Sequence, residues 1–179
     1  MNLVIIDCQN DFVHGALAAV NGEETVDAIV DFLKDHDDLK VFYSLDFHPT
    51  DHCSFKDQGG LWPAHCVADT DGAKVHEKFS QTKYPADINR SYYKGRDKDR
   101  EEYSAFDAEN DLGHLLRDDL EGPIYLAGIA SEYCVRETAL DFKKAGREVI
   151  VLKDLLGYID QEDHEKNLQD LLDQGIQVQ

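Results

Sequence analysis

The hydrophobic positions of the chain form short apolar runs that alternate with segments of helical periodicity. Such runs are typical of parallel strands covered on both faces, and they predict strands over Leu3–Ile6 and Pro123–Gly128. An alternating pattern predicts a strand over Lys40–Leu45, and further strands are expected over Ser91–Lys94, Arg147–Leu152 and, at the edge, Ile176–Val178. Apolar residues three and four positions apart predict helices over Thr25–Lys34, Asn110–Asp119, Cys134–Ala145 and Gln161–Asp173. Residues 47–90 have little periodicity and form a long loop-rich segment, which in a compact domain is often functional.

This alternation of strands and helices predicts the fold class. We expect an α/β fold of three layers, α/β/α, around a mostly parallel sheet of about six strands. With 179 residues, the chain suits one domain over residues 1–179 with one hydrophobic core.

The charge balance argues against a nucleic-acid-binding protein. The chain has 37 acidic and 18 basic residues, a formal net charge of −19, whereas phosphate contacts need clustered lysine and arginine. No apolar run is long enough to cross a membrane, and the first residues resemble a strand rather than a signal peptide. We therefore expect a cytoplasmic protein without nucleic-acid or membrane partners. The four cysteines are then expected as free thiols, ligands or a nucleophile, and a homo-oligomer stays open.

Three candidate catalytic groups fall at or just beyond the ends of predicted strands. Asp7 and Asp46 end or follow the first two strands, and Cys134 follows the turn after Gly128. In open α/β sheets, ligands bind outside the carboxyl ends of the strands, so these groups can converge on one crevice. For Asp7, a structural role as a cap of the following turn stays open beside a catalytic one.

Asp46 and His48 form a candidate metal site, because side chains two positions apart in an extended chain point to the same side. An aspartate oxygen with histidine nitrogens suits zinc, manganese or iron(II). Two ligands alone are weak evidence, since this spacing is common on surfaces. The loop-rich segment offers His52 and His65 as a third ligand, and Cys66 is a further candidate.

Cys134 opens a predicted helix after a turn. A helix N-terminus carries partial positive charge and free N–H groups, which lower the pKa of a thiol and can hold an oxyanion. Lys94, at the end of another predicted strand, would favour the thiolate further if it lies beside the sulfur. The alternatives are a buried, inert cysteine and a solvated surface lysine.

Six motifs together resemble the nicotinamidase/pyrazinamidase family within the isochorismatase-like hydrolases. They are Asp7-x-Gln9-x-Asp11-Phe12, Asp46-Phe47-His48-Pro49, Gly60-Leu61-Trp62-Pro63-x-His65-Cys66, Lys94-Gly95, Tyr103-Ser104-x-Phe106 and Gly128-x-Ala130-x-x-Tyr133-Cys134-Val135. Each motif has low specificity alone, but their order and spacing are highly specific. The resemblance spans Val4 to about Leu152.

The resemblance implies an enzyme that hydrolyses nicotinamide to nicotinate and ammonia, also accepts pyrazinamide, and serves NAD salvage. It implies a catalytic triad of Asp7, Lys94 and Cys134. It also implies one divalent metal, with zinc ahead of manganese and iron, held by Asp46, His48 and His65, and by His52 as an extra ligand in some relatives.

The resemblance further implies how the substrate is held. Its aromatic walls would be Phe12, Trp62 and Tyr103, and Ala130 would also contact it. The N–H groups of Ala130 and Cys134 would form the oxyanion hole, and the family commonly has a cis peptide at the position of Ile129–Ala130.

Two other functions are compatible with parts of this pattern. The nearest is another amidase of the superfamily, such as an N-carbamoyl amine hydrolase, although those relatives generally lack the Asp46, His48 and His65 set. The other is a non-catalytic metal-binding or interaction protein that has lost activity. Ammonia release from nicotinamide by the purified protein separates these alternatives.

Overall fold

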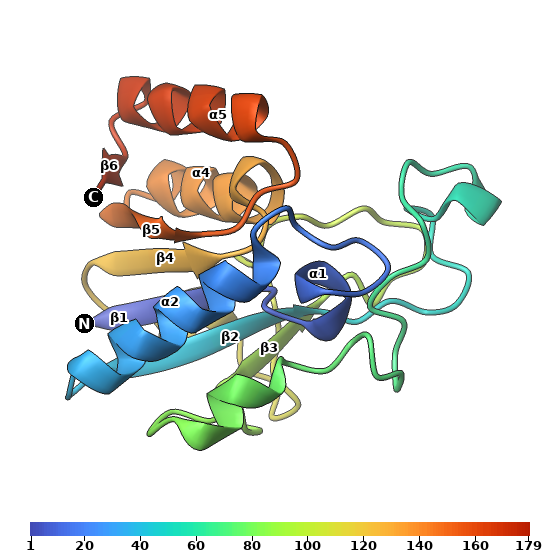
Figure 1. Ribbon diagram of the computed structural model, residues 1–179, viewed down its shortest axis with the longest axis horizontal. Helices are drawn as coiled ribbons and strands as arrows, with labels where there is room; N and C mark the ends of the chain where they lie inside the picture. The colour runs from blue at the N-terminus through green and yellow to red at the C-terminus, as the bar shows by residue number, and fades with distance from the viewer.

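The computed structural model describes residues 1–179 and contains a single six-stranded sheet (Figure 1). The strands are β1 (Asn2–Ile6), β2 (Lys40–Asp46), β3 (Ser91–Lys94), β4 (Ile124–Gly128), β5 (Val149–Leu156) and β6 (Gln177–Val178). They lie in the order β3-β2-β1-β4-β5-β6, and every neighbouring pair is parallel. The predicted α/β fold is confirmed, with a sheet that is parallel throughout.

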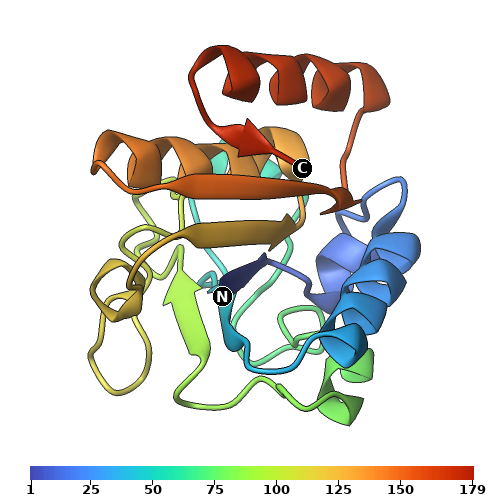
Figure 2. The same ribbon diagram turned by 90° about the vertical axis from the view of Figure 1, so that its left-hand side faces the viewer.

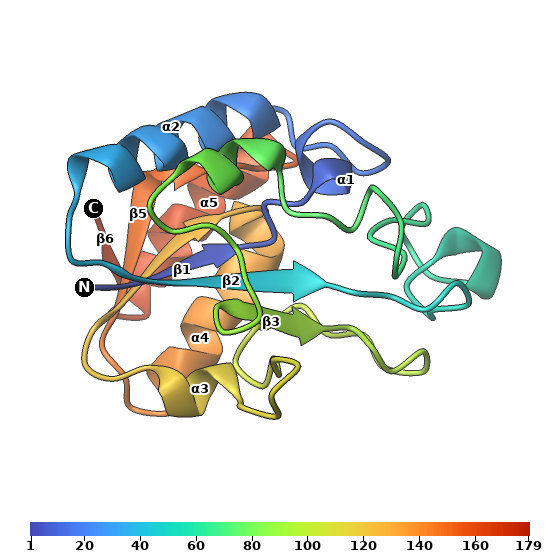
Figure 3. The same ribbon diagram turned by 90° about the horizontal axis from the view of Figure 1, so that it is seen from below.

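Helices cover both faces of this sheet. They are α1 (Asn10–Val13), α2 (Gly22–Asp35), α3 (Leu116–Asp119), α4 (Arg136–Lys144) and α5 (Gln161–Asp173). Figure 3 shows α2 on one side of the sheet and α3 and α4 on the other, and Figure 2 shows α5 above the edge strand β6. No helix combines the length and the apolar character that a membrane span requires.

The burial of β1 explains its continuous apolar run. Leu3 and Ile5 pack into the core beneath α2, whereas Val4 and Ile6 pack into the core beneath α3, α4 and α5. All four side chains are fully buried. A strand at the centre of a sheet that is covered on both faces has no position left for a polar residue.

The segment after β2 extends beyond the carboxyl edge of the sheet, at the right of Figure 1. Between β2 and β3 its only helices are two short 3-10 turns, Lys56–Gln58 and Glu77–Gln81. The predicted loop-rich character of residues 47–90 is therefore confirmed. The segment lies where parallel strands present their carboxyl ends, which is the usual place for a ligand site.

The predicted helix over Asn110–Asp119 is wrong for most of its length, because only Leu116–Asp119 is helical. The side-chain oxygen of Asn110 accepts hydrogen bonds from the N–H groups of Leu112 (3.0 Å) and His114 (2.9 Å). This side chain closes a loop in place of a helical turn. Leu112, whose spacing with Leu115 and Leu116 suggested the helix, is 52% exposed.

Candidate active site and metal centre

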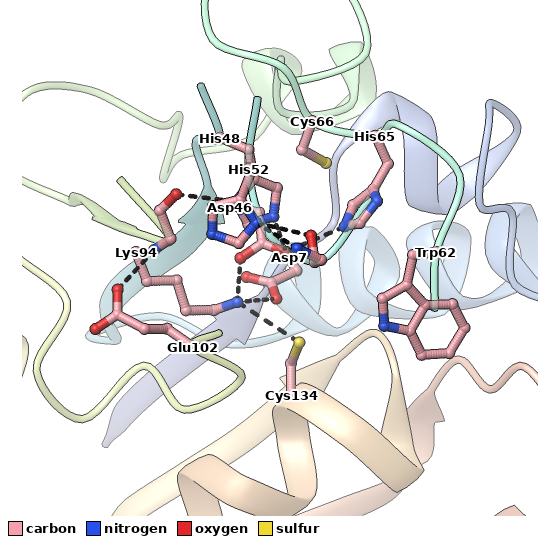
Figure 4. A network of polar contacts seen from close by, with 12 residues as sticks. Asp7, Asp46, His48, His52, Trp62, His65, Cys66, Lys94, Glu102 and Cys134 are labelled. Carbon is pink, nitrogen blue, oxygen red and sulfur yellow. Dashed lines mark hydrogen bonds and ion pairs between the residues drawn. The ribbon is translucent and has the colours of Figure 1, made fainter. Parts of the chain in front are cut away.

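Four adjacent strands each deliver one candidate side chain to the same edge of the sheet. Asp7 follows β1, Asp46 ends β2, Lys94 ends β3, and Cys134 lies in the π-helical turn Ser131–Val135 after β4. Because β3, β2, β1 and β4 are neighbours in that order, their carboxyl ends bring these side chains into contact (Figure 4). The order of β1 and β4 also makes this the point where successive connections leave in opposite directions.

The ammonium of Lys94 lies at the centre of this cluster. Its Nζ is 2.8 Å from Oδ2 of Asp7 and 3.5 Å from Sγ of Cys134, and it also donates to Oδ1 of Asp46. Burial would lower the pKa of Lys94, but Asp46 and Asp7 outweigh burial and raise it well above its ordinary value. The side chain therefore holds a positive charge between two carboxylates and a thiol.

Asp7 is a buried carboxylate with one oxygen left for chemistry. Its Oδ1 accepts a hydrogen bond from Oγ of Ser44 at 2.7 Å, whereas Oδ2 has no hydrogen-bond partner beyond its ion contact with Lys94. Burial raises the pKa of Asp7 to about 6, although Lys94 lowers it. One oxygen each of Asp7 and Asp46 and the sulfur of Cys134 lie within 4.8 Å of one another. Asp7 is thus placed to take a proton from the thiol.

The thiol of Cys134 differs from the sequence-based expectation of a lowered pKa. Its side chain is only 6% exposed, and burial together with Asp7 and Asp46 raises its pKa well above the ordinary value, against the lowering effect of Lys94. The electrostatics of the buried cluster outweigh those of the helix end. The resting sulfur is therefore a protonated thiol that needs a base.

The turn that holds Cys134 is fixed from both of its ends. Thr138 donates its hydroxyl to the carbonyl oxygen of Cys134 at 2.7 Å, and the N–H of Ser131 donates to Gly157 at 2.8 Å. The Ile129–Ala130 peptide bond before the turn is cis, as the resemblance implies. No backbone hydrogen bond uses the N–H of Ala130, which leaves this donor free.

Asp46, His48 and His65 form a compact group of potential metal ligands. Oδ2 of Asp46 is 3.3 Å from Nε2 of His48 and 3.9 Å from Nε2 of His65. Ligands at ~2.0–2.1 Å from a tetrahedral zinc ion are about 3.3 Å apart, so the spacing fits a divalent cation. Nδ1 of each histidine donates to a carbonyl oxygen, of Gly95 (2.9 Å) and Pro63 (2.8 Å), which leaves each Nε2 with a lone pair.

Gly95 explains why a glycine follows Lys94 in the motif. Its φ is 67°, and a Cβ atom on it would lie 2.3 Å from the ring of His48. Its carbonyl oxygen accepts from His48, and its N–H donates to Glu102 at 2.9 Å. This peptide therefore orients a candidate metal ligand, and only glycine leaves room for the ring.

His52 and Cys66 do not join the ligand group. Nδ1 of His52 contacts the hydroxyl of Ser54 at 2.7 Å, and its Nε2 contacts the carbonyl oxygen of Arg100 at 3.0 Å. Both ring nitrogens are therefore engaged elsewhere, although the ring lies close to that of His48. Sγ of Cys66 faces the carbonyl oxygen of Gly72 at 3.9 Å. All four cysteines of the chain are free.

Aromatic side chains lie against the candidate ligand His65 and beside the turn that holds Cys134. Phe12 is buried with its ring 5.3 Å from that of His65. Nε1 of Trp62 donates to the hydroxyl of Tyr103 at 3.0 Å, and its ring packs edge-on against Tyr133 at 5.1 Å. Tyr133 had no role in the sequence-based hypothesis, although it stands in the same motif as Cys134.

Two further residues hold the site together without having been given a role from the sequence. The amide of Gln9 pairs with both the N–H and the carbonyl of Asp46, each at 2.8 Å, and so fixes the end of β2. Oδ2 of Asp11 accepts from the N–H of Cys66 at 2.8 Å, beside His65. Their signal in the sequence was the polar alternation Asp7, Gln9, Asp11 directly after an apolar strand.

Residues 1–179 match the isochorismatase domain. A nicotinamidase/pyrazinamidase of Mycobacterium tuberculosis is 35% identical over 162 residues, which cover 86% of this chain and 84% of that protein.

Two crystal structures show the same fold over nearly the whole chain. A pyrazinamidase of Pyrococcus horikoshii in complex with zinc is 34% identical, with a TM-score of 0.86 over 99% of this chain and 97% of the other. PnC1 from L. infantum in complex with nicotinate is 31% identical, with a TM-score of 0.84 over 99% and 91%. The chain therefore belongs to the isochorismatase family and, within it, to the nicotinamidases and pyrazinamidases.

Proposed function

We propose that this protein is a metal-dependent cysteine amidohydrolase that converts nicotinamide to nicotinate and ammonia, accepts pyrazinamide and serves NAD salvage. The observation that carries the proposal is the contact of Lys94 with both Asp7 and Cys134, beside the Asp46, His48 and His65 group. The similar proteins are named for these substrates, and one of the similar structures holds nicotinate.

The first half of the reaction follows from the protonation states of the triad. The carboxylate of Asp7 takes the proton of the Cys134 thiol, and Lys94 stabilises the negative charge that forms on sulfur. The thiolate attacks the carboxamide carbon and forms a carbon–sulfur bond. The N–H groups of Ala130 and Cys134 hold the oxyanion of the tetrahedral intermediate.

The second half returns the enzyme to its starting state. Protonated Asp7 gives its proton to the leaving nitrogen, and ammonia departs as the carbon–nitrogen bond breaks. Water then hydrolyses the thioester, which releases nicotinate and restores the Cys134 thiol. Asp7 accepts the proton of the water in this step, because it is the same buried base beside the same sulfur.

The substrate ring would lie between aromatic side chains beside this machinery. Phe12 and Trp62 would stack against the two faces of the ring, with Tyr103 held in place by its hydrogen bond from Trp62, and Ala130 would contact the amide. A compact apolar slot with few polar groups suits a planar pyridine or pyrazine amide.

We propose zinc as the metal, with manganese and iron(II) as the alternatives that the same donor set allows. Asp46, His48 and His65 would hold it, since their donor atoms converge and both Nε2 atoms carry lone pairs. When bound, the cation supplies an electrophilic contact for the ring nitrogen of the substrate, which orients the amide toward Cys134. His52, an extra ligand in some relatives, has both ring nitrogens engaged by Ser54 and Arg100.

We further propose that residues 1–179 form one hydrolase domain and that the protein acts in the cytoplasm. Four free cysteines, one of them the proposed nucleophile, suit a reducing compartment. Its partner is a small molecule rather than nucleic acid, because the net charge of −19 repels phosphate backbones.

Ammonia release from nicotinamide tests the proposal, with metal-loaded and chelator-treated protein measured side by side. We expect activity that disappears with the metal and returns when zinc is added back. Folded, reduced protein that releases no ammonia from nicotinamide under either condition would contradict the proposed substrate. Activity that survives complete metal removal would contradict the role of the metal group.

A further inference from the structure

A second group of histidine and carboxylate side chains lies outside the site described above. It consists of His14 just after α1, Glu23 in the first turn of α2, and His76 at the start of the 3-10 helix Glu77–Gln81. One ligand atom from each lies within 4.8 Å of the others. Figure 3 shows α1, α2 and this 3-10 helix (green) on the same side of the sheet.

The spacing of these ligand atoms matches that of the first group. Nδ1 of His14 is 3.1 Å from Oε1 of Glu23, and Nε2 of His76 is 3.5 Å from the same oxygen. Ligands at ~2.0–2.1 Å from a tetrahedral zinc ion lie about 3.3 Å apart. Two histidines and one glutamate are a donor set that zinc takes in proteins, with a fourth position left for water.

The surroundings combine one fixed ligand with access for a cation. His76 is only 5% exposed, whereas the side chains of His14 and Glu23 are about half exposed, at 51% and 46%. His14 and His76 line a surface hollow of about 450 Å³ together with Asp71 and Glu77. Lys74 lines the same hollow and pairs with Asp71 at 2.9 Å, so Glu77 is the carboxylate that favours the approach of a metal ion.

Lys78 contacts only one of the two carboxylate oxygens of Glu23. Its Nζ is 3.1 Å from Oε2 and 2.6 Å from Asp27, so Oε1 stays available to the histidines. Burial raises the pKa of Glu23, but hydrogen bonds from Lys78 and His14 outweigh it and hold the pKa below its ordinary value. Glu23 is therefore ionised when a cation arrives.

We propose that His14, Glu23 and His76 form a second divalent-metal site, which takes zinc and ties α1 to α2 and to the 3-10 helix. Its role is to stabilise these segments, because its three ligands come from three separate stretches of chain and a metal that binds only the folded state stabilises it.

Binding requires a change of tautomer in both histidines. Nδ1 of His14 donates to Oε1 of Glu23 in the metal-free protein, so zinc on Nδ1 moves that proton to Nε2. Nδ1 of His76 accepts the N–H of Lys78 at 3.3 Å, so Nε2 carries the ring proton in the metal-free protein. Zinc on Nε2 moves this proton to Nδ1 and breaks that contact. At 3.3 Å the hydrogen bond is long, so little is lost.

Metal content after equilibrium dialysis against micromolar free zinc tests the proposal. We expect two zinc ions per chain in the wild type, and one in His14→Ala, in Glu23→Gln and in Asp46→Asn. His114→Ala, which removes an exposed histidine outside both groups, serves as the matched control and should keep two. One zinc per wild-type chain, or two in both His14→Ala and Glu23→Gln, would overturn the proposal.

Thermal unfolding of the Asp46→Asn protein isolates the second site from the first. Zinc should raise its Tm, and adding Glu23→Gln to this background should abolish the rise. If zinc still raises the Tm after Glu23→Gln is added, the proposed site is refuted. Because His14→Ala leaves the catalytic groups untouched, its ammonia release should equal that of the wild type, and the outcome for metal content is independent of which amide the enzyme hydrolyses.

Discussion

At the scale of single residues, Cys134 gives the sharpest prediction, because its sulfur is buried between Lys94 and a carboxylate oxygen of Asp7. Cys134→Ala should lower ammonia release by about a thousandfold or more, since no other group can form the thioester. Metal content and circular dichroism should stay those of the wild type. Cys53→Ala, at a partly exposed cysteine outside the cluster, is the control and should retain full activity. Substantial activity in Cys134→Ala would contradict the proposed role of Cys134 as the nucleophile.

The carboxyl of Asp7 sets the expected pH dependence. Burial raises its pKa to about 6, and the group must be ionised to take the proton from Cys134. Its base function is therefore present above pH 6 and is lost as the pH falls through about 6. We expect kcat/KM for nicotinamide to fall tenfold per pH unit below this value. Asp7→Asn should cost about 10²–10⁴-fold in kcat/KM and remove this acid limb. An unchanged limb in Asp7→Asn would assign it to another group.

Single residues also show where sequence reasoning stopped. Asp7, Asp46 and Cys134 could be found because each stands at or just beyond the carboxyl end of an apolar run. The raised pKa of Cys134 could not be predicted, because it depends on how deeply four strands bury one cluster. The hydrogen bonds between the Gln9 amide and the backbone of Asp46 could not be predicted either, because 37 positions separate the two residues.

At the scale of elements, the turn after β3 makes a testable claim about glycine. In Gly95→Ala, the new Cβ would lie 2.3 Å from the ring of His48, so the ring must move. We expect about 10–100-fold weaker metal binding, measured by competition with a chromophoric chelator. Gly113→Ala is the matched control, because Gly113 also has a positive φ of 83° but has nothing within 4 Å of its Cβ position. Equal losses in both variants would show that backbone strain, not the contact with His48, is responsible.

Elements were predictable where burial imposes a period on the sequence. The six strands and the helices α2 and α5 were found from the sequence, although β5 continues to Leu156, beyond its expected end at Leu152. The helix expected over Asn110–Asp119 failed because one polar side chain, that of Asn110, satisfies backbone donors that a helix would use. The four-residue helix α1 is too short to show a period. Its ends are fixed by tertiary contacts such as that of the Asn10 N–H with Lys74.

At the scale of the whole molecule, the strand order brings the candidate residues together, and no local sequence pattern specifies that order. The candidate residues Lys94, Asp46, Asp7 and Cys134 are scattered from position 7 to position 134, yet they follow β3, β2, β1 and β4, which are neighbours in the sheet. A sequence predicts that carboxyl ends share an edge but not which strands lie side by side. The sequence analysis gives no strand order, and the structure supplies it.

The whole molecule also carries a large excess of negative charge. The acidic residues outnumber the basic ones by 19, so the mutual repulsion of negative charges opposes the compact state. Salt shortens the range of this repulsion, from about 10 Å at 0.1 M to about 3 Å at 1 M. Exposed ion pairs such as Lys34–Asp31 weaken as well, but each contributes little. We therefore expect Tm to rise by several degrees between low salt and 1 M sodium chloride, in calorimetry at fixed pH.

An uncharged osmolyte at equal osmolality is the control for this measurement, because it changes the solvent without screening charge. A second control removes negative charges at exposed sites instead of screening them. Replacing Asp154 and Asp173, which form no ion pair, by asparagine should raise Tm at low salt and reduce the gain that salt brings, since fewer like charges remain to be screened. The buried carboxylates Asp7 and Asp46 should contribute nothing to this gain, because screening by dissolved ions does not reach a cluster held against Lys94. A Tm that is flat or falling with salt would mean that surface ion pairs outweigh the net repulsion.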